Sequence, residues 1–215
     1  MSILFIGSTK GGTGKSTIAS NLSVLLNQEG ESLLVDTDLN RSASYWAGVR
    51  SESEISPRVP CIQLYGKSVN HELPQLANKY DHIIVDGAGH DSAEFRSALI
   101  HSQIFLLVLK PSQFDVWSLD HLEPILDQVT SSFNPGLITK IVLNQASTHP
   151  FDNMTEKALD VLMEYKNVSV CKSVIRHRKA FQSSIETGQG VSEGPDRKAR
   201  EEIINLYKEI YETRK

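Results

Sequence analysis

The chain has little cysteine and no long apolar run. Its two cysteines, Cys61 and Cys171, lie far apart and form no Cys-x-x-Cys pair, which argues against a disulfide scaffold and favours a reduced, cytoplasmic setting. The longest apolar run, Ile104–Leu109, has six residues, whereas about 20 are needed to span a bilayer. No basic segment followed by an apolar one opens the chain, so we expect no secretory signal.

The composition is that of a folded domain. Hydrophobic residues make up 40% and charged residues 22% of the 215 positions, which is ordinary for a globular protein. We predict a single domain over residues 1–215 and no N-terminal helix-turn-helix domain, because the first predicted strand begins at residue 2. The net charge is −4, yet the segment from residue 172 onward holds ten basic and seven acidic side chains. Such a segment is either a solvated helical surface or an anion-binding face.

Short apolar runs alternate with helical patterns along the chain. Parallel strands buried on both faces have continuous apolar sequences, and the helices between them form the crossovers. We therefore predict an α/β fold with a doubly wound, mostly parallel sheet and helices on both faces. The segment Arg50–Pro60 is polar, contains two prolines and is predicted to be a loop. The predicted strands are Ser2–Ile6, Ser32–Val35, His82–Val85, Ile104–Leu109, Leu137–Leu143 and Val168–Ile175, and the predicted helices are Lys15–Gln28, Asp115–Val129, Thr155–Tyr165 and Arg197–Tyr211.

The strongest signal is the sequence KGGTGKST, which lies between the first predicted strand and the first predicted helix. Glycines let backbone N–H groups approach phosphates, and the helix N-terminus adds a positive dipole. In such a loop Lys15 reaches the β- and γ-phosphates of a nucleotide and the Ser16 hydroxyl binds Mg²⁺. The usual pattern has a glycine where Thr9 stands, and this loop has instead an extra lysine, Lys10. The predicted nucleotide-binding residues of the loop are Lys10, Gly11, Gly12, Thr13, Gly14, Lys15, Ser16 and Thr17.

Two further strands end in carboxylates. The run LLVDTD ends in Asp36 and Asp38, which the period of a strand would point to the same side, and IIVDGAG carries Asp86 before a pair of glycines. Ligands of open α/β sheets bind beyond the carboxyl ends of the strands. We therefore expect these carboxylates to converge with the glycine-rich loop on one Mg²⁺–nucleotide site, with Asp86 on the magnesium side.

Six segments of the chain together resemble one family. They are KGGTGKST from Lys10, LLVDTD from Leu33, IIVDGAG from Ile83, KPSQFD from Lys110, IVLN from Ile141 and RKAF from Arg178. They are similar to motifs of the ParA/MinD family of deviant-Walker P-loop ATPases, and within it to the short ParA-type ATPases that partition or position cargo.

The resemblance implies a mechanism. It implies a Mg²⁺-dependent ATPase that dimerises with ATP, binds DNA without sequence preference, and distributes cargo over the nucleoid with a ParB-like or other cargo-bound partner that stimulates hydrolysis. By the family pattern, Lys10 contacts phosphates across the dimer interface, Lys15 acts within the site, and Asp38 positions the attacking water. The family usually has Pro-Gln where this chain has Leu39 and Asn40.

The nucleotide is predicted to be ATP. A GTPase would carry Asn-Lys-x-Asp after the relevant strand, whereas this chain has Asn144-Gln145-Ala146-Ser147. Asn144 is then a base contact, or else an asparagine of a turn at the strand end.

The predicted DNA-binding residues lie in the basic C-terminal segment. Arg178 matches a position of the family motif, and its alternative role is a salt bridge that holds a helix to the sheet. The other basic side chains are either phosphate contacts or solvated surface. The predicted set is Arg176, Arg178, Lys179, Arg197, Lys198 and Arg200.

Two alternative classes share the fold. A MinD-like membrane-associated ATPase would need a basic amphipathic last helix. The last predicted helix instead has core spacing at five positions and an acidic remainder. The core positions are Ile203, Leu206, Tyr207, Ile210 and Tyr211, and the other positions carry Glu201, Glu202, Glu209 and Glu212 with only Lys208. We thus expect no membrane contact and a cytoplasmic, nucleoid-associated protein. The other alternative is a metabolic P-loop enzyme of the dethiobiotin synthetase type, which would not need Lys10. The cargo, whether plasmid, chromosome, carboxysome or protein cluster, stays open.

Overall fold

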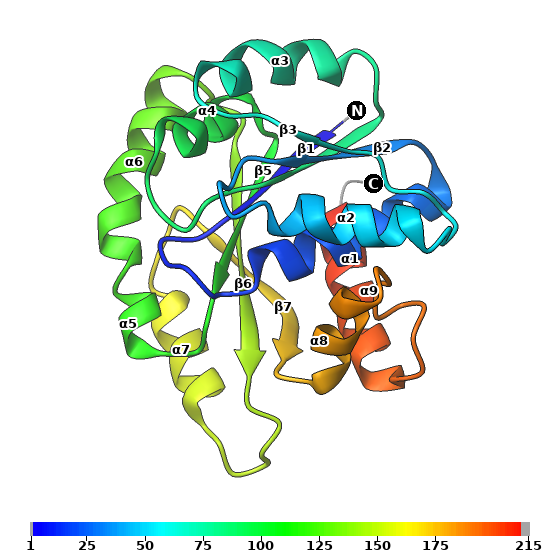
Figure 1. The fold of residues 1–215 in the computed structure, drawn as a ribbon. Coiled ribbons are helices and arrows are strands. Elements are labelled where there is room, and N and C mark those ends of the chain that lie inside the picture. Colours follow the sequence, from blue (N-terminus) through cyan, green and yellow to red (C-terminus); the bar gives the residue numbers. More distant parts are fainter. Residues whose placement is uncertain (1, 212–215) are drawn as a thin grey trace.

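A single parallel sheet organises the chain. In the computed structural model, which describes residues 2–211, seven strands pair in the order β3-β2-β4-β1-β5-β6-β7 (Figure 1). All neighbouring strands are parallel. The predicted doubly wound α/β fold is therefore confirmed. The strands are β1 Ser2–Gly7, β2 Ser32–Asp36, β3 Cys61–Gln63, β4 His82–Asp86, β5 Ile104–Leu109, β6 Ile138–Ala146 and β7 Ser169–Arg176.

Helices cover both faces of the sheet (Figure 1). One layer contains α1 Lys15–Glu29, α2 Ser42–Glu52, α8 Lys179–Glu186 and α9 Arg197–Tyr211, and the other contains α3 Lys67–Ala77, α4 Ala93–His101, α5 Gln113–Val116, α6 Leu119–Ser132 and α7 Met154–Leu162. Within residues 2–211, no helix has the length and apolar character needed to cross a membrane.

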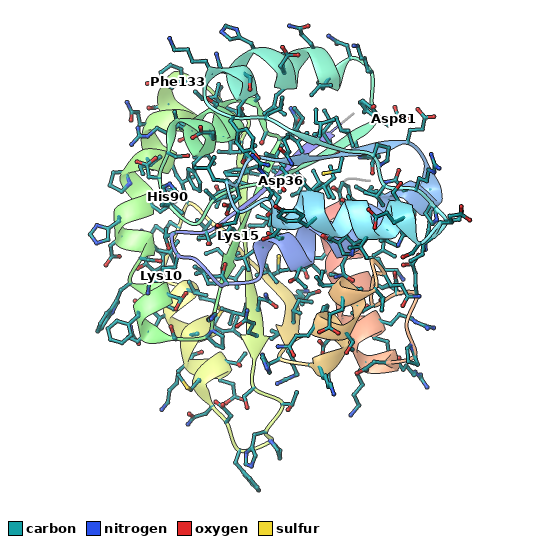
Figure 2. All side chains as sticks on the ribbon, viewed as in Figure 1. Lys10, Lys15, Asp36, Asp81, His90 and Phe133 are labelled. Carbon is teal, nitrogen blue, oxygen red and sulfur yellow. The ribbon has the colours of Figure 1, made fainter. Side chains whose placement is uncertain are left out.

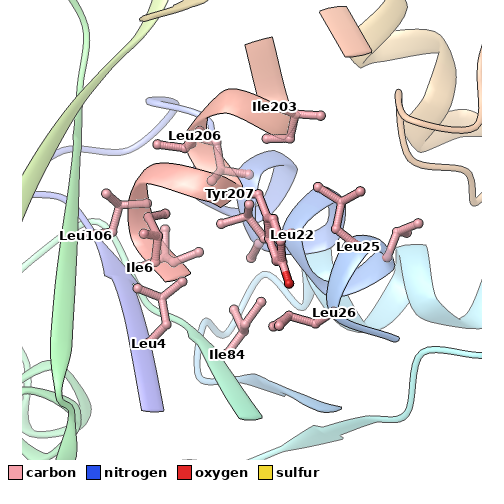
Figure 3. Packing of buried hydrophobic residues seen from close by; sticks show 14 of the residues in the cluster. Leu4, Ile6, Leu22, Leu25, Leu26, Ile84, Leu106, Ile203, Leu206 and Tyr207 are labelled. Carbon is pink, nitrogen blue, oxygen red and sulfur yellow. The ribbon is translucent and has the colours of Figure 1, made fainter. Parts of the chain in front are cut away.

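The two layers follow from the two-residue period of the strands. In β1, Leu4 and Ile6 pack under α1 and α9, whereas Ile3 and Phe5 pack on the opposite side with α3, α4 and α6. Figure 3 shows the first of these cores, where leucines of α1 meet α9 over the sheet. Four of the five predicted core positions of α9 are buried here, and the fifth, Tyr211, is half-buried against the same core. Glu212 of the predicted acidic face lies outside the described residues.

Some elements differ from the prediction. The sequence patterns do not predict α2, β3, α3, α4 or α8, because their buried positions are few and include alanines, serines and one arginine. The predicted loop from Arg50 is wrong at its start, since α2 runs to Glu52. The predicted helix Asp115–Val129 is divided, because the chain bends between α5 and α6 at Ser118, whose hydroxyl donates to the Asp115 carbonyl at 2.5 Å.

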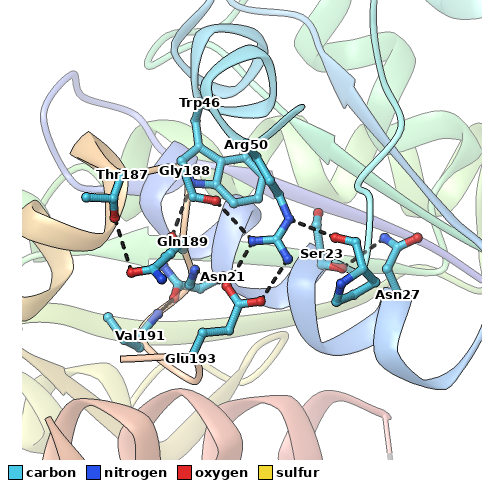
Figure 4. A network of polar contacts seen from close by, with 12 residues as sticks. Asn21, Ser23, Asn27, Trp46, Arg50, Thr187, Gly188, Gln189, Val191 and Glu193 are labelled. Carbon is cyan, nitrogen blue, oxygen red and sulfur yellow. Dashed lines mark hydrogen bonds and ion pairs between the residues drawn. The ribbon is translucent and has the colours of Figure 1, made fainter. Parts of the chain in front are cut away.

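A buried ion pair holds Arg50, in the last turn of α2, in the interior of the protein. The side chain of Arg50 is 1% exposed and forms a two-pronged salt bridge with Glu193 at 2.8 Å. Its remaining donors reach the carbonyls of Pro57 and Gly188, and its guanidinium lies 5.7 Å from the Trp46 ring centroid (Figure 4). A sequence pattern cannot identify this arginine as buried, because its partner lies 143 residues away.

This network leads to a prediction about stability. Glu193→Ala leaves the buried Arg50 guanidinium without its carboxylate, so we expect the free energy of unfolding in urea to fall by about 3 kcal/mol. Glu201→Ala is the matched control, because its partner Arg197 is 88% exposed and such a pair contributes less than about 1 kcal/mol. Equal losses in the two variants would contradict the assigned role of Arg50.

Candidate nucleotide-binding site

Three loops meet at the carboxyl edge of the sheet. The strands β2, β4 and β1 are neighbours, and Asp36 of β2 lies in register with Asp86 of β4, which pairs with Ile6 of β1. The loop from Ser8 to Gly14 follows β1 directly and leads into α1. Together these loops surround a cavity of about 490 Å³. It is lined by Gly11, Gly12, Gly14, Lys15, Ser16, Thr17, Ser20, Asp38, Asn40, Ser42, Ala88, Gly89, His90 and Ile185.

The start of α1 presents free backbone donors to this cavity. Gly14 stands at the N-terminus of the helix with a left-handed φ of 91°, and no side chain caps the first turn. A Cβ at Gly14 would lie 2.2 Å from Nδ2 of Asn144, so both its backbone conformation and its surroundings require glycine. An uncapped helix N-terminus of this kind is a binding site for an anion such as phosphate.

Lys15 is buried at the base of the cavity. The side chain lies in the interior, and its ammonium has one hydrogen bond, to the Ser8 hydroxyl at 3.3 Å. Burial lowers the pKa of this lysine, while the carboxylates of Asp86 and Asp38 act in the opposite direction. A buried ammonium with one neutral acceptor is poorly compensated. Phosphate oxygens would supply the missing acceptors.

Asp86 is the second buried group whose polar atoms are incompletely satisfied. Its side chain is fully buried, and among the described residues neither carboxylate oxygen accepts a hydrogen bond of normal geometry. Burial raises its pKa from 3.8 to about 7; the Ser16 hydroxyl and Lys15 oppose the rise, and Asp36 and Asp38 add to it. A buried carboxylate without donors beside a serine hydroxyl fits a divalent cation with its water shell. The residues present therefore fit the predicted magnesium position.

Asp36 and Asp38 have different surroundings. The strand β2 ends at Asp36, so the strand period does not extend to Asp38. The Asp36 carboxylate accepts hydrogen bonds from the backbone N–H groups of Asp38 at 3.1 Å and Ser44 at 2.8 Å, and thereby ties the strand end to α2. Asp38 lines the cavity and accepts a hydrogen bond from the Asn40 N–H at 2.9 Å. Of these two carboxylates, Asp38 is the one available to a ligand.

Lys10 lies outside the cavity of its own chain. Its ammonium donates to the Phe114 carbonyl at 2.6 Å and lies 3.8 Å from the Asp115 carboxylate. Figure 2 shows Lys10 on the side of the loop toward α5, away from Lys15 and Asp36. Gly89 packs so closely against the loop that a Cβ there would lie 2.6 Å from the Lys10 carbonyl oxygen.

A second cavity, of about 350 Å³, continues from the first. It shares Gly14 and Thr17 with the first cavity and also contains Asn144 and Phe181. The Asn144 amide donates to the Thr13 carbonyl at 2.7 Å, and the Gln145 amide donates to the Gly12 carbonyl at 3.0 Å. Asn144 therefore both braces the loop and borders the second cavity. Sequence reasoning placed His90 near the site, because it follows the glycine pair after β4. It assigned no role to Gln145, Phe181 or Ile185, because nothing in the local pattern of any of them indicates a cavity.

Of the predicted DNA-binding residues, the four arginines have partners within the chain and the two lysines have none among the described residues. Arg178 bonds to Glu202 of α9 at 2.7 and 3.0 Å, which is the salt bridge considered as its alternative role. Arg176 borders the second cavity and donates to the Ser147 carbonyl. Arg197 pairs with Glu201, and Arg200 donates to the Gly194 carbonyl. Lys179 and Lys198 are exposed, and their side chains have no hydrogen bond or ion pair with the described residues.

The fold and the site define a P-loop nucleotide-binding α/β protein with an extra lysine at the front of the loop. The chain belongs to the CobQ/CobB/MinD/ParA nucleotide binding domain family, whose model matches residues 4–191. Within that family its motifs resemble those of the ParA/MinD-type deviant-Walker proteins.

The chain is similar to individual relatives over nearly its whole length. The chain is 28% identical over 210 residues to the "Maintenance of carboxysome distribution protein A" of Halothiobacillus neapolitanus, covering 96% of this chain and 95% of that protein. The fold is similar to that of Cyanothece McdA, solved as a variant in complex with ATP, with a TM-score of 0.83, 15% identity, and 98% and 96% of the two chains covered. It is also similar to the septum site-determining protein MinD of Pyrococcus horikoshii OT3 complexed with Mg-ADP, with a TM-score of 0.76, 22% identity, and 99% and 96% covered.

The burial of Asp86 predicts an inverse dependence of stability on pH in metal-free, nucleotide-free protein. At pH 5 the folded chain holds a proton on Asp86 that the unfolded chain has lost, and as the pH rises through about 7 the folded chain loses it too, so stability falls between pH 5 and pH 8. With about 1.4 kcal/mol for each pKa unit, we expect a loss of about 2–3 kcal/mol over this interval. Asp86→Asn lacks the titrating carboxyl, so this loss of stability should be absent in the variant. Urea unfolding in EDTA at pH 5 and at pH 8 measures it.

The control is Asp81→Asn. Asp81 is exposed, directly precedes β4 and lies far from the cavity (Figure 2). It should retain the wild-type pH dependence. If Asp86→Asn and the wild type change in parallel, Asp86 does not titrate in this interval.

Proposed function

We propose that this chain binds Mg·ATP and hydrolyses it. The observation that carries the proposal is the pairing of a buried, poorly compensated Lys15 with a buried Asp86 that lacks donors, under the uncapped N-terminus of α1. Polyphosphate oxygens would accept hydrogen bonds from Lys15 and from the loop N–H groups. Ser16 and Asp86 would hold Mg²⁺, which, when bound, neutralises charge on the β- and γ-phosphates. The Mg·ADP and ATP complexes of the relatives support this nucleotide.

The second cavity suits an adenine base. The Asn144 amide nitrogen is used by the Thr13 carbonyl, which leaves the side-chain oxygen as an acceptor. The amino group of adenine is a donor, whereas guanine carries a carbonyl oxygen at the corresponding position. Phe181 offers an apolar surface beside it. These features favour ATP over GTP.

The proposed hydrolysis uses Asp38 and two copies of the chain. Phosphoryl transfer needs an oriented water and neutralised charge more than covalent chemistry from the protein. Asp38 borders the loop cavity and would orient the water once its bond to the Asn40 N–H opens. Lys10 lies outside its own cavity, so its ammonium would reach the phosphates of a second copy and join hydrolysis to dimerisation.

Two substitutions separate binding from turnover. Lys15→Ala should weaken ATP binding at least about 100-fold, because the charge-assisted hydrogen bonds from its ammonium to phosphate are removed. Asp38→Ala should bind ATP and dimerise as the wild type does, while phosphate release falls at least about 100-fold. Isothermal titration and a phosphate-release assay measure the two effects. Unchanged ATP affinity in Lys15→Ala would falsify the assignment of the site.

We further propose that the ATP-bound dimer binds DNA without sequence preference through the starts of α8 and α9. Arg197, Lys198 and Arg200 lie in the first turn of α9, where cations oppose the helix dipole. The Arg178–Glu202 bridge joins the start of α8 to α9 and so brings Lys179 close to this turn. Two such faces in one dimer would double the phosphate contacts.

Reversing charge on the two unengaged lysines tests the DNA face. Lys179→Glu with Lys198→Glu should weaken binding of random duplex DNA by the ATP dimer at least about tenfold. The salt dependence should flatten by about 0.9 for each phosphate that the variant no longer neutralises. ATP affinity should stay unchanged. Lys67→Glu with Lys79→Glu, beside α3 at the opposite end of the molecule (Figure 1), is the matched control.

A control pair that weakens DNA binding as much as the test pair would indicate a general charge effect and contradict the face. Arg176 and Arg178 are left out of the variant because both have partners within the chain.

The biological role that we propose is cargo positioning in the cytoplasm, on the nucleoid, with a cargo-bound partner that stimulates hydrolysis. The relative from Halothiobacillus neapolitanus is a carboxysome distribution protein, which favours an organelle or protein assembly over a plasmid as cargo. The burial of the apolar face of α9 in the core disfavours membrane binding through that helix. The position of Lys10 at the front of the loop, outside its own cavity, disfavours a metabolic enzyme of the dethiobiotin synthetase type.

A further inference from the structure

Two large aromatic side chains are exposed beside the phosphate-binding loop. Phe114 is 72% exposed and Trp117 is 54% exposed. Their ring centroids lie 5.8 Å apart at 85°, an edge-to-face pair. They belong to the short helix α5 and the residue that follows it. Large aromatic residues at a surface are typical anchors of protein–protein contacts.

This aromatic pair and Lys10 form one surface. The Lys10 ammonium lies 5.6 Å from the centroid of the Phe114 ring and donates to the carbonyl of the same residue. A hydrogen bond of 2.5 Å between the hydroxyls of Thr9 and Ser118 fastens the front of the loop to the start of α6. Whatever approaches Lys10 therefore also approaches Phe114.

Lys10 also borders a partly apolar cavity. This cavity has a volume of about 300 Å³ and lies between the loop, the segment after β4 and α6. Its lining includes Lys10, His90, Phe95, Leu122 and Ile125. Lys10 thus stands between an exposed aromatic pair and an apolar hollow, in surroundings that suit a protein surface more than a small polar ligand.

We propose that Phe114 and Trp117 anchor the contact with a second copy of this chain in the ATP-bound state. The inference rests on the proposed ATP-dependent dimer and names the side chains that its interface buries.

Charge identifies the occupant as a second copy. ATP makes the loop cavity anionic, and Lys10 is a cation at the rim that does not enter its own cavity. A two-fold contact uses the same surface on both copies, so each Lys10 faces the anionic site of the other. Phe114, 5.6 Å from the Lys10 ammonium, then lies inside the buried patch. The contact exchanges the internal bond to the Phe114 carbonyl for phosphate of the second copy.

Tryptophan fluorescence measures this burial directly. The chain has two tryptophans, and Trp46 is 2% exposed, so iodide in solution quenches Trp117 selectively. With Mg²⁺ and a nonhydrolysable ATP analogue, at protein concentrations where the chain sediments as a dimer, the iodide quenching constant should fall at least about threefold. Lys10→Ala, which should stay monomeric, should keep the quenching of the nucleotide-free protein.

A double variant measures the contribution of the pair to dimerisation. Phe114→Ser with Trp117→Ser should raise the dimer dissociation constant at least about tenfold. Analogue affinity, which also reports a folded site, should stay unchanged when measured at concentrations where both proteins are monomers. Phe133→Ser is the matched control, because Phe133 is 59% exposed and lies far from Lys10 (Figure 2). It should dimerise as the wild type does.

The outcomes separate this inference from the proposed function. A wild type that stays monomeric with the analogue overturns the ATP-dependent dimer itself. A wild type that dimerises while Trp117 stays open to iodide, with the double variant dimerising equally well, overturns the aromatic anchor alone. In that second case a surface for another protein is the remaining role of the pair.

Discussion

Lys15 and Asp86 are held in the interior with charges that the protein itself does not fully compensate. The lysine has one neutral hydrogen-bond acceptor, and the aspartate has no donor of normal geometry among the described residues. Removing charge from water costs several kcal/mol unless partners replace the water. A ligand that carries both negative oxygens and a divalent cation compensates both side chains at once. The site is therefore built at the expense of stability without ligand, and this sets its preference for a metal-bound polyphosphate.

Other residues keep these two charges in place. Thr37 donates through both its N–H and its hydroxyl to the Asp86 carbonyl, each at 2.9 Å, and so joins the ends of β2 and β4. The Asp36 carboxylate connects β2 to the start of α2. Asn144 and Gln145 hold the loop from the end of β6. The strand ends are thus tied together, and β6 holds the loop directly, which reduces the reorganisation required when a nucleotide binds.

The Arg50 network connects the two cavities. The helix α2 begins shortly after Asp38, and its buried arginine bonds to Gly188 and Glu193 just beyond α8, which contributes Phe181 and Ile185 to the second cavity. The Trp46 indole adds a hydrogen bond to the Gln189 carbonyl at 3.2 Å. These contacts pack the segment after α8 against α2, the helix that follows Asp38.

The sequence alone determined the parallel α/β class, because the apolar runs of β1, β4 and β5 are long enough to require burial on both faces. It also identified the phosphate-binding loop and the carboxylates after β2 and β4, since glycine spacing and strand-end acids are local features that chemistry restricts tightly. Only the tertiary structure decided which of those residues face the cavity. Asp36 turned to the backbone of α2, Lys10 turned toward α5, and Arg178 paired with Glu202, because each contact joins segments distant in sequence or depends on where a strand ends. The buried Arg50 and the exposed Phe114 and Trp117 contradict what their residue types suggest, since burial depends on partners that no local pattern contains.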